Sequence, residues 1–508
     1  MAEWAASFLS DGVDRMTLTR LPGDLHLGRR PQGRTLLTAD WLIGHEDGRH
    51  VYYRRGDLVI EGRRVLYAGP RFPGEVTRRI DFGAALIAPG LIDLDALSDL
   101  DTYALALDNH PGWQKGRIRP QTYIDRGPRE MYAPEELAFQ KRHAFATLLC
   151  NGITTALPIA SLYYREWAET VAEFDAAADA ALDLGLRVFL GPAYRSGGVA
   201  VDEAGAFHQY FDEARGLAGL AAARDFIARR KGEGGLIDGL LAPDRAETNT
   251  AALMRATFAA AGELDVPVRL HMAQGALELQ LMRARHGVTA PRWLADLGCL
   301  SPRLIAPHGT HADADDIGLY ADHGVTLAHS PLVSLRMGSI LRSFAKVKAR
   351  GVNIGMATDT APPDMWMNMM AGLSACRVAE GRADAASSAE FFEAATLGGA
   401  RALARPDLGR LQAGALADLA VFALDDPAMT PTVDPVTTLV LGASGKVTRA
   451  VFVDGRLSMW QGRVAGLDLP AARARAQAQF DGLVATYPER SWRHPPVDDL
   501  FRPAFPIR

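Results

Sequence analysis

The sequence predicts an α/β protein, a (β/α)8 barrel that carries a small composite β-sandwich domain formed by the two ends of the chain. Through the middle of the chain, helix-like segments alternate with short apolar segments that are typical of strands. Apolar strands that alternate with helices form a parallel sheet with helices on its outer face. Each predicted strand ends in polar residues, and in a closed barrel these ends share one mouth, where active sites lie.

The first helix and strand of this pattern are the clearest. A helix is expected over 134–150, because Pro134 and two glutamates occupy its first turn and Asn151 and Gly152 end it. A β-branched strand over 153–158 follows. The later elements, in order, are a helix over 166–185, a strand over 186–192, a helix capped by Thr248 or Asn249 and running to Gly262, and strands over 266–272, 303–308, 325–330 and 352–358.

Short strands with tight turns of the DG and EG type lie at both ends of the chain, and they predict one small β domain. The expected parts are 1–83 (an N-terminal arm and the first part of the small domain), 84–400 (the barrel), 401–465 (the second part of the small domain) and 466–508 (a helix and an extended arm). The arm is expected to pack on its own chain or on a neighbouring subunit.

Composition narrows the functional class. At 508 residues the chain exceeds one compact core and fits a large barrel with a small accessory domain. A net charge of -5 gives no general attraction to nucleic acid or to membranes. The cysteines Cys150, Cys299 and Cys376 lie far apart, without a disulfide or C-x-x-C pattern. With no signal segment and no apolar run near ~20 residues, we expect a cytoplasmic protein.

The segment PGLIDLDAL (89–97) carries the main family resemblance. It resembles the first barrel strand of the amidohydrolase superfamily, where a His-x-His pair holds a catalytic metal. Here those two positions are Asp95 and Leu97, so the chain resembles an atypical member of the triazine chlorohydrolase and guanine-cytosine deaminase-like branch. Further matches are NGITTALP (151–158), His271, His308, HSPLVSLRMG (329–338) and Asp359.

This resemblance implies a divalent, zinc-like metal ion, which lowers the pKa of bound water from ~16 to ~7. The expected ligands are Asp95, His271 and Asp359, and His308 contacts the water or the substrate or helps to hold the ion. Leucine cannot bind a metal, so we expect one weakly held ion or none. No organic cofactor is expected. Without the family context, the same residues would be hydrogen-bonded buried polar groups.

The expected catalytic residues are Asp359 as general base, His308 as the group that stabilises developing negative charge, His271 and Gln274. Members of the deaminase branch carry a proton-shuttling glutamate three residues after the fifth-strand histidine, and this chain has Gln274 there. An amide can orient water or substrate but cannot transfer a proton. Proton transfer would then depend on Asp359, His308 or Asp95. Glu278 is expected to be a charge at the helix start.

Substrate contacts are expected from loops at the barrel mouth. The aromatic and basic segment 108–130 supplies His110 and Trp113, with Arg117, Arg119 and Tyr123 as further candidates. Tyr194, Arg195 and His329 follow other strands, and an arginine there can bind a carboxylate or a ring carbonyl. We expect Asp93 to hydrogen-bond backbone behind the site, and His311 to be a loop or helix-start residue. Asp99 and Asp101 belong either to the mouth or to a solvated loop.

Three functional hypotheses follow. The first is a hydrolase with one metal ion, acting on a carbon–nitrogen or carbon–halogen bond of a small, cyclic nitrogen compound. The second is a metal-independent enzyme that uses Asp359 and the histidines for hydrolysis, ring opening or elimination. The third is a non-catalytic relative that binds a small molecule; it is disfavoured because buried polar groups are costly to keep without a role. The expected partners are a small-molecule substrate and a second copy of the chain in a dimer.

Overall fold

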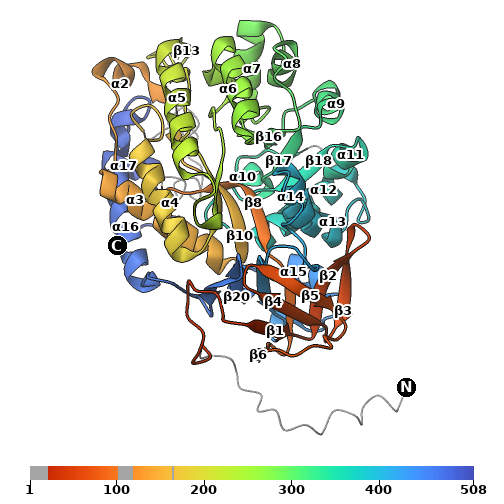
Figure 1. Ribbon diagram of the computed structural model, residues 1–508. Coiled ribbons are helices and arrows are strands. Elements are labelled where there is room, and N and C mark those ends of the chain that lie inside the picture. The colour runs from red at the N-terminus through yellow and green to blue at the C-terminus, as the bar shows by residue number, and fades with distance from the viewer. Residues whose placement is uncertain (1–20, 101–117, 163–164, 342) are drawn as a thin grey trace.

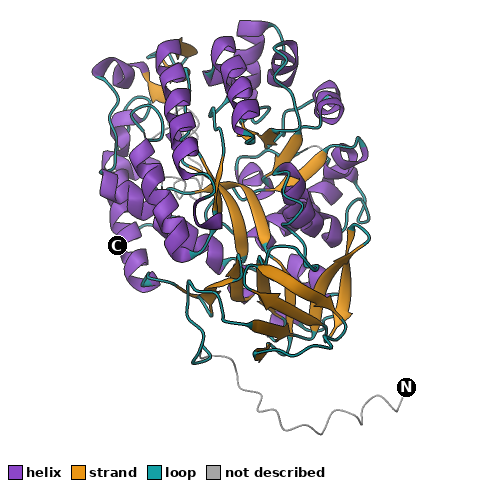
Figure 2. Cartoon of the chain, viewed as in Figure 1, coloured by secondary structure: helices purple, strands orange, loops and turns teal. Residues whose placement is uncertain are grey.

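A computed structural model describes residues 21–100, 118–162, 165–341 and 343–508. Its larger part consists of parallel strands surrounded by helices, and small sheets lie below this part in Figure 1. Figure 2 shows the helices on the outside of the central strands. The prediction of an α/β protein is confirmed.

The central strands form a ring. They are β8 (Leu91–Leu97), β10 (Ile153–Ile159), β11 (Arg187–Leu190), β14 (Ile237–Gly239), β15 (Val268–Arg269), β16 (Leu304–Pro307), β17 (Thr326–His329) and β18 (Asn353–Met356). They pair in two parallel sheets, in the orders β14-β11-β10-β8 and β15-β16-β17-β18. Leu241 bridges Val268 between the two sheets at one edge. At the other edge, the backbone N–H of Asp359 donates to the carbonyl of Asp95 at 2.9 Å, so the ring closes.

Helices cover the outside of this ring (Figure 2). In chain order they are α3 (Pro134–Cys150), α4 (Val171–Leu184), α5 (Glu213–Arg230), α6 (Ala251–Leu264), α7 (Ala276–His286), α8 (Ala290–Asp296), α9 (Ala314–His323), α10 (Pro331–Arg336), α11 (Phe344–Ala349), α12 (Met365–Glu380), α13 (Ser388–Glu393) and α14 (Gly399–Ala402). None of the helices in the described ranges has both the length and the apolar composition needed to cross a membrane.

Helix starts show where local sequence signals were sufficient. α3 has the predicted bounds, and the Glu136 carboxylate accepts the backbone N–H of Ala133 at 2.8 Å. α4 begins five residues later than predicted, because the Thr170 side chain caps it. The predicted cap of α6 was wrong. Thr250 caps this helix, since Thr248 lies in a 3-10 turn and the Asn249 amide donates to the carbonyls of Pro243 and Arg245.

Both ends of the chain contribute to the small sheets. One sheet has the order β5-β4-β1-β6 and the other the order β22-β21-β20-β19-β7-β2-β3. The N-terminal strands are β1 (Arg34–Thr38), β2 (Trp41–Glu46), β3 (Arg49–Arg54), β4 (Asp57–Glu61), β5 (Arg64–Gly69), β6 (Arg78–Asp81) and β7 (Ala85–Pro89). The C-terminal strands are β19 (Leu419–Ala423), β20 (Thr448–Val453), β21 (Arg456–Trp460) and β22 (Arg463–Val464), and α15 (Pro435–Gly442) lies between β19 and β20.

Pairing of β19 with β7 joins the two ends of the chain in one sheet. Both small sheets share a core, in which Leu37 and Leu58 of one sheet pack with Leu42 and Phe452 of the other. β7 belongs to this sheet, so the sheet extends past the predicted boundary at residue 83. The other predicted domain boundaries remain predictions.

A third sheet lies over the barrel mouth, with the order β13-β12-β9. Its strands are β9 (Arg119–Pro120), β12 (Gly197–Val201) and β13 (Phe207–Phe211), and α2 (Gln121–Arg126) follows β9. The C-terminal segment forms α16 (Leu469–Thr486) and α17 (Val497–Leu500). It packs on its own chain next to this sheet, since Trp492 Nε1 donates to the carbonyl of Asp202 at 2.8 Å.

Candidate active site

Four of the predicted site residues meet at the carboxyl ends of the barrel strands. Asp95 lies near the end of β8, and His271, His308 and Asp359 directly follow the parts of the chain that form β15, β16 and β18. Asp95, His271 and His308 are all buried. Their meeting follows from the fold, because parallel barrel strands end on the same face.

Asp95, His271 and His308 form a compact group, here called the Asp-His-His cluster. One ligand atom from each lies within 4.8 Å of the other two. Asp95 Oδ2 is 3.2 Å from His271 Nε2, and the rings of His271 and His308 have centroids 5.4 Å apart. Asp359 reaches the cluster through His308, since Asp359 Oδ2 is 3.4 Å from His308 Nε2. The cluster therefore contains His308 in the position where the sequence suggested Asp359.

The backbone is strained around this cluster. His308, Asp359, Ala273 and Asp244 have φ angles of 75°, 41°, 51° and 39°. Residues other than glycine seldom adopt this left-handed region, and such strain is concentrated at functional sites. The strand ends are therefore held in shapes that local sequence does not favour, as expected for a site whose side chains must be precisely aimed.

Charges in the cluster are set by burial and by close partners. Burial acts to raise the pKa of Asp95, but His271 and Arg269 outweigh it and lower this pKa, so the carboxylate is ionised. Burial, together with neighbouring His271, holds the pKa of His308 well below its ordinary value, so this ring is neutral. A neutral imidazole and an ionised carboxylate are the forms that bind metal ions.

The donor set fits a divalent metal ion. Atoms bound to zinc at about 2.1 Å in a tetrahedron lie about 3.4 Å from one another. Asp95 Oδ2 and His271 Nε2 are 3.2 Å apart, and the three ligand atoms of the cluster all lie within 4.8 Å of one another. His308 Nε2 is buried and makes no hydrogen bond to the described part of the chain. His271 Nδ1 is 2.9 Å from the carbonyl of Asp244, which leaves Nε2 for a ligand.

Asp93 lies behind the cluster, as predicted. It is fully buried, and it accepts hydrogen bonds from the backbone N–H groups of Asp95 at 3.1 Å and Thr358 at 3.0 Å. Burial raises its pKa to about 6. Asp93 therefore joins β8 to the chain after β18 and helps to position Asp95 and Asp359 across the closing edge of the ring.

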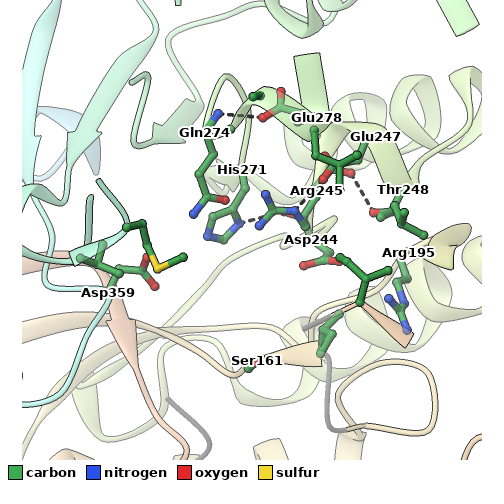
Figure 3. Close-up of a pocket in the computed structure, with 18 of the residues that line it drawn as sticks. Ser161, Arg195, Asp244, Arg245, Glu247, Thr248, His271, Gln274, Glu278 and Asp359 are labelled. Carbon is green, nitrogen blue, oxygen red and sulfur yellow. Dashed lines mark hydrogen bonds and ion pairs between the residues drawn. The ribbon is translucent and has the colours of Figure 1, made fainter. Parts of the chain in front are cut away.

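A cavity of about 610 Å³ opens beside the cluster. His271, Gln274 and Asp359 line it together with Arg195, and Figure 3 shows Asp359 and Arg195 at opposite sides of the view. This volume suits a small organic molecule. We expected Asp95, His271, His308 and Asp359 to surround one cavity; of these four, His271 and Asp359 line it, whereas Asp95 and His308 are not among its lining residues.

Gln274 and Glu278 occupy different parts of the cavity wall. The Glu278 carboxylate accepts the backbone N–H groups of Ala273 at 2.6 Å and Gln274 at 2.7 Å, in the first turn of α7. Glu278 therefore lies at the helix start as expected, but burial raises its pKa to about 8, against the expectation of a charge. Gln274 Oε1 is buried and has no hydrogen-bond partner within the described residues, so it can accept a hydrogen bond from a bound molecule.

The predicted substrate contacts divide into three groups. Arg195 lines the cavity, is 6 % exposed, and has Nε and Nη2 without hydrogen-bond partners in the described ranges. Tyr194 and His329 lie outside the lining, because the Tyr194 hydroxyl pairs with Thr257 Oγ1 at 2.9 Å and His329 packs near Phe344 and Phe391. His110 and Trp113, with Asp101 and Arg117, fall outside the described residues.

Other candidates from the sequence are also located. His311, expected to be a loop or helix-start residue, does line the cavity, as does the expected substrate contact Arg119. Tyr123 instead lies under the C-terminal segment, where Arg490 Nη2 donates to its hydroxyl at 2.9 Å. Asp99 Oδ2 accepts the backbone N–H of Ser161, so it fixes the loop after β10.

Sequence reasoning missed the residues that follow β14. Asp244, Arg245 and Glu247 all line the cavity, and Arg245 Nε pairs with Glu247 Oε1 at 2.8 Å. Glu247 Oε2 is buried and makes no hydrogen bond to any described residue. The available signal was the polar run PDRAETN (243–249) after an apolar segment, but β14 has only three residues and was not recognised as a strand.

The chain is also similar to known proteins. The model of the amidohydrolase family matches residues 98–458. The chain belongs to the amidohydrolase family. An 8-oxoguanine deaminase of Pseudomonas aeruginosa is 31 % identical over 445 residues, which cover 85 % of this chain and 95 % of the relative. A 5-methylthioadenosine/S-adenosylhomocysteine deaminase of Nitratidesulfovibrio vulgaris is 27 % identical over 447 residues, 86 % of this chain and 94 % of the relative.

Solved structures share the fold. The atrazine chlorohydrolase of Arthrobacter aurescens complexed with zinc has a TM-score of 0.71 and 22 % sequence identity, and the match covers 88 % of this chain and 99 % of that one. The predicted family, in the branch of the triazine hydrolases and purine-type deaminases, is confirmed. The protein is therefore an enzyme, a hydrolase of the amidohydrolase superfamily that acts on carbon–nitrogen bonds.

Proposed function

We propose that this amidohydrolase deaminates an amino-substituted, cyclic nitrogen compound by hydrolysis, with one divalent metal ion. The observation that carries this proposal is the Asp-His-His cluster beside Asp359 at a cavity of about 610 Å³. The curated relatives are deaminases of purine-type compounds, and several similar structures contain zinc. Removal of an exocyclic amino group by water is the reaction that these features have in common.

Asp95, His271 and His308 would hold the ion, with Asp359 beside it. When bound, the ion lowers the pKa of water and polarises the attacked group. Asp359 is the general base of this proposal, because its carboxylate both lines the cavity and lies 3.4 Å from His308 Nε2. Its partial exposure, 13 % for the side chain, lets it contact a water molecule and a bound substrate.

The cavity wall would bind and orient the substrate. Gln274 Oε1 accepts a substrate N–H but transfers no proton. Arg195 donates to an electron-rich group, such as a ring carbonyl or a carboxylate, through its unpaired Nε and Nη2. Glu247 Oε2 accepts from a donor group of the substrate. A substrate with donors near Gln274 and Glu247 and an acceptor near Arg195 fits these three positions.

The test uses the purified protein and a panel of amino-substituted purines, nucleosides, pyrimidines and triazines, with ammonia release as the readout. Once a substrate is found, Asp359→Asn is expected to reduce kcat by roughly 10²–10⁴-fold with little change in KM, because a general base is lost while binding remains. The matched control is Asp322→Asn, an exposed change on α9, which is expected to leave kcat unchanged.

Three outcomes oppose the proposal. Normal turnover by Asp359→Asn removes this residue from the role of base. Full activity after dialysis against a chelator would support instead the metal-independent enzyme, whereas loss of activity that Zn²⁺ restores supports the metal-dependent one. If the protein releases chloride from a chlorinated triazine and releases ammonia from no amine, the bond that it cleaves is carbon–halogen and not the proposed carbon–nitrogen bond.

A further inference from the structure

Arg269 is a buried cation directly below the Asp-His-His cluster. It is 1 % exposed and lies on β15, two residues before His271. Side chains two residues apart on a strand point to the same face, so Arg269 points into the barrel on the side of His271. Together with His271 it lowers the pKa of Asp95. The proposed deamination gives it no other role, and an arginine inside a barrel requires compensating partners.

Two groups hold the Arg269 guanidinium. Nη1 donates to the carbonyls of Leu157 at 2.7 Å and Pro158 at 3.1 Å, near the end of β10. Nε lies 3.2 Å from Asp95 Oδ1. The side chain therefore spans the barrel interior from β15 to β10 and passes β8, and its position is fixed by strands on both sides.

The two oxygens of Asp95 face different partners. Oδ1 faces Arg269 Nε, whereas Oδ2 faces His271 Nε2, both at 3.2 Å. Only Oδ2 is therefore directed at the place where an ion would lie between Asp95, His271 and His308. The contact between Arg269 Nε and Asp95 Oδ1 is an ion pair without hydrogen-bond geometry, since neither atom has a hydrogen-bond partner within the described residues, and it places the guanidinium charge beside the oxygen that faces away from His271.

A cation at this site is attracted by Asp359, which lies 3.4 Å from His308 Nε2, and by the acidic member of the cluster, Asp95. A permanent positive charge beside it cancels part of this attraction and repels a divalent ion. Leu97, in the second ligand position of the family pattern, offers no donor atom to compensate. The small number of ligands and the fixed charge of Arg269 both weaken the binding of a metal ion, and mutations at Leu97 and Arg269 can separate the two effects.

We propose that Arg269 is a positioning residue that sets the affinity of this site for a divalent cation, by placing a fixed positive charge beside Asp95 that opposes the ion's charge. This inference rests on the metal site of the proposed function. Removing the charge should tighten metal binding, although it also removes hydrogen bonds that hold the barrel together.

The experiment measures the dissociation constant of Zn²⁺ for metal-free protein, by competition with a chromophoric chelator and without substrate. Arg269→Gln, which keeps an N–H donor without the charge, is expected to tighten Zn²⁺ binding at least tenfold. Arg269→Lys keeps a positive charge but not the planar guanidinium that contacts both Asp95 and β10, and it is expected to bind Zn²⁺ less tightly than Arg269→Gln. Leu97→His adds a donor and should tighten binding further in an Arg269→Gln background.

An Arg269→Gln protein that folds normally by circular dichroism and binds Zn²⁺ no more tightly than the parent would overturn the proposal. So would tightening by Leu97→His alone, with no effect of Arg269→Gln, because ligand number would then set the affinity. Arg269→Met is a second neutral variant in case the glutamine fails to fold. If both neutral variants unfold and the lysine variant folds, the charge serves the fold and the inference fails.

These results are independent of turnover. Unchanged Zn²⁺ affinity in neutral variants, with a parent protein that deaminates a substrate, removes only the role of Arg269. Tighter binding in those variants, with no compound of the panel turned over, removes only the proposed reaction.

Discussion

Lys141 offers the sharpest test of how the barrel is held together near its mouth. It is completely buried on α3, and its Nζ lies 2.7 Å from Ser98 Oγ, 3.3 Å from Glu169 Oε1 and 3.2 Å from Glu173 Oε1. Replacing it with methionine would leave two buried carboxylates without their central cation. We expect Lys141→Met to destabilise the protein strongly.

The size of this effect follows from the burial of the groups. Removing one partner of a buried ion pair costs about 3–5 kcal/mol, because the remaining charge has no compensation. Arg165 also pairs with Glu173 at 2.7 Å, which places the expected value at the lower end. With an unfolding entropy of about 2.1 cal/mol/K per residue, the melting temperature should fall by about 3–7 °C, depending on how much of the chain unfolds together.

Thermal unfolding followed by circular dichroism or calorimetry measures this change. Arg142→Met, at the neighbouring residue, is the matched control. Arg142 pairs with Asp183 at 2.9 Å, and the Asp183 side chain is 63 % exposed. An exposed pair contributes about 0–1 kcal/mol, so the control should melt within about 2 °C of the parent. If Lys141→Met melted like Arg142→Met, the buried ion pairs would not stabilise this part of the barrel.

Two further predictions concern the cavity wall. Arg195→Gln is expected to raise KM about tenfold or more on the substrate of the proposed reaction while kcat changes less, because a buried donor pair is lost; an unchanged KM would remove Arg195 from the binding site. Burial, together with Glu247, raises the pKa of Glu278 to about 8 from an ordinary value of 4.5, so the folded protein holds a proton that the unfolded chain releases. Stability from this group should therefore be present below about pH 4.5 and be lost as pH rises to about 8, by at most ~1.4 kcal/mol per pH unit. Glu278→Gln should flatten this decline in melting temperature, and equal slopes in parent and variant would contradict the raised pKa.

The catalytic ends of the barrel strands could be predicted because their signals are local. His271, His308 and Asp359 each follow an apolar strand, and the parallel topology then places them together. After a strand has ended, the sequence does not show which of two neighbouring residues faces the mouth. Tyr194 and Arg195 show this, since Tyr194 packs against Thr257 of α6 whereas Arg195 lines the cavity.

Contacts between strands that are far apart in the chain likewise could not be predicted from the sequence. Arg269 pairs with Asp95, which lies 174 positions earlier in the chain, and no local sequence pattern indicates this contact. Glu247 was missed because β14 is too short for the alternation of apolar and polar residues to appear. The motif at β8 indicated that one metal ligand was missing, but it did not indicate that a buried cation lies beside the remaining one.

The left-handed backbone at His308, Asp359, Ala273 and Asp244 has a consequence for anyone who redesigns this enzyme. Each such residue costs about 1–3 kcal/mol, and the rest of the fold must supply that stability. Variants selected for a new substrate will most often change residues at the barrel mouth, where these strained residues lie, and there the protein tolerates little further loss of stability. Directed evolution of this protein should therefore begin by stabilising the small sheets or the outer helices, far from the mouth, before the cavity is changed.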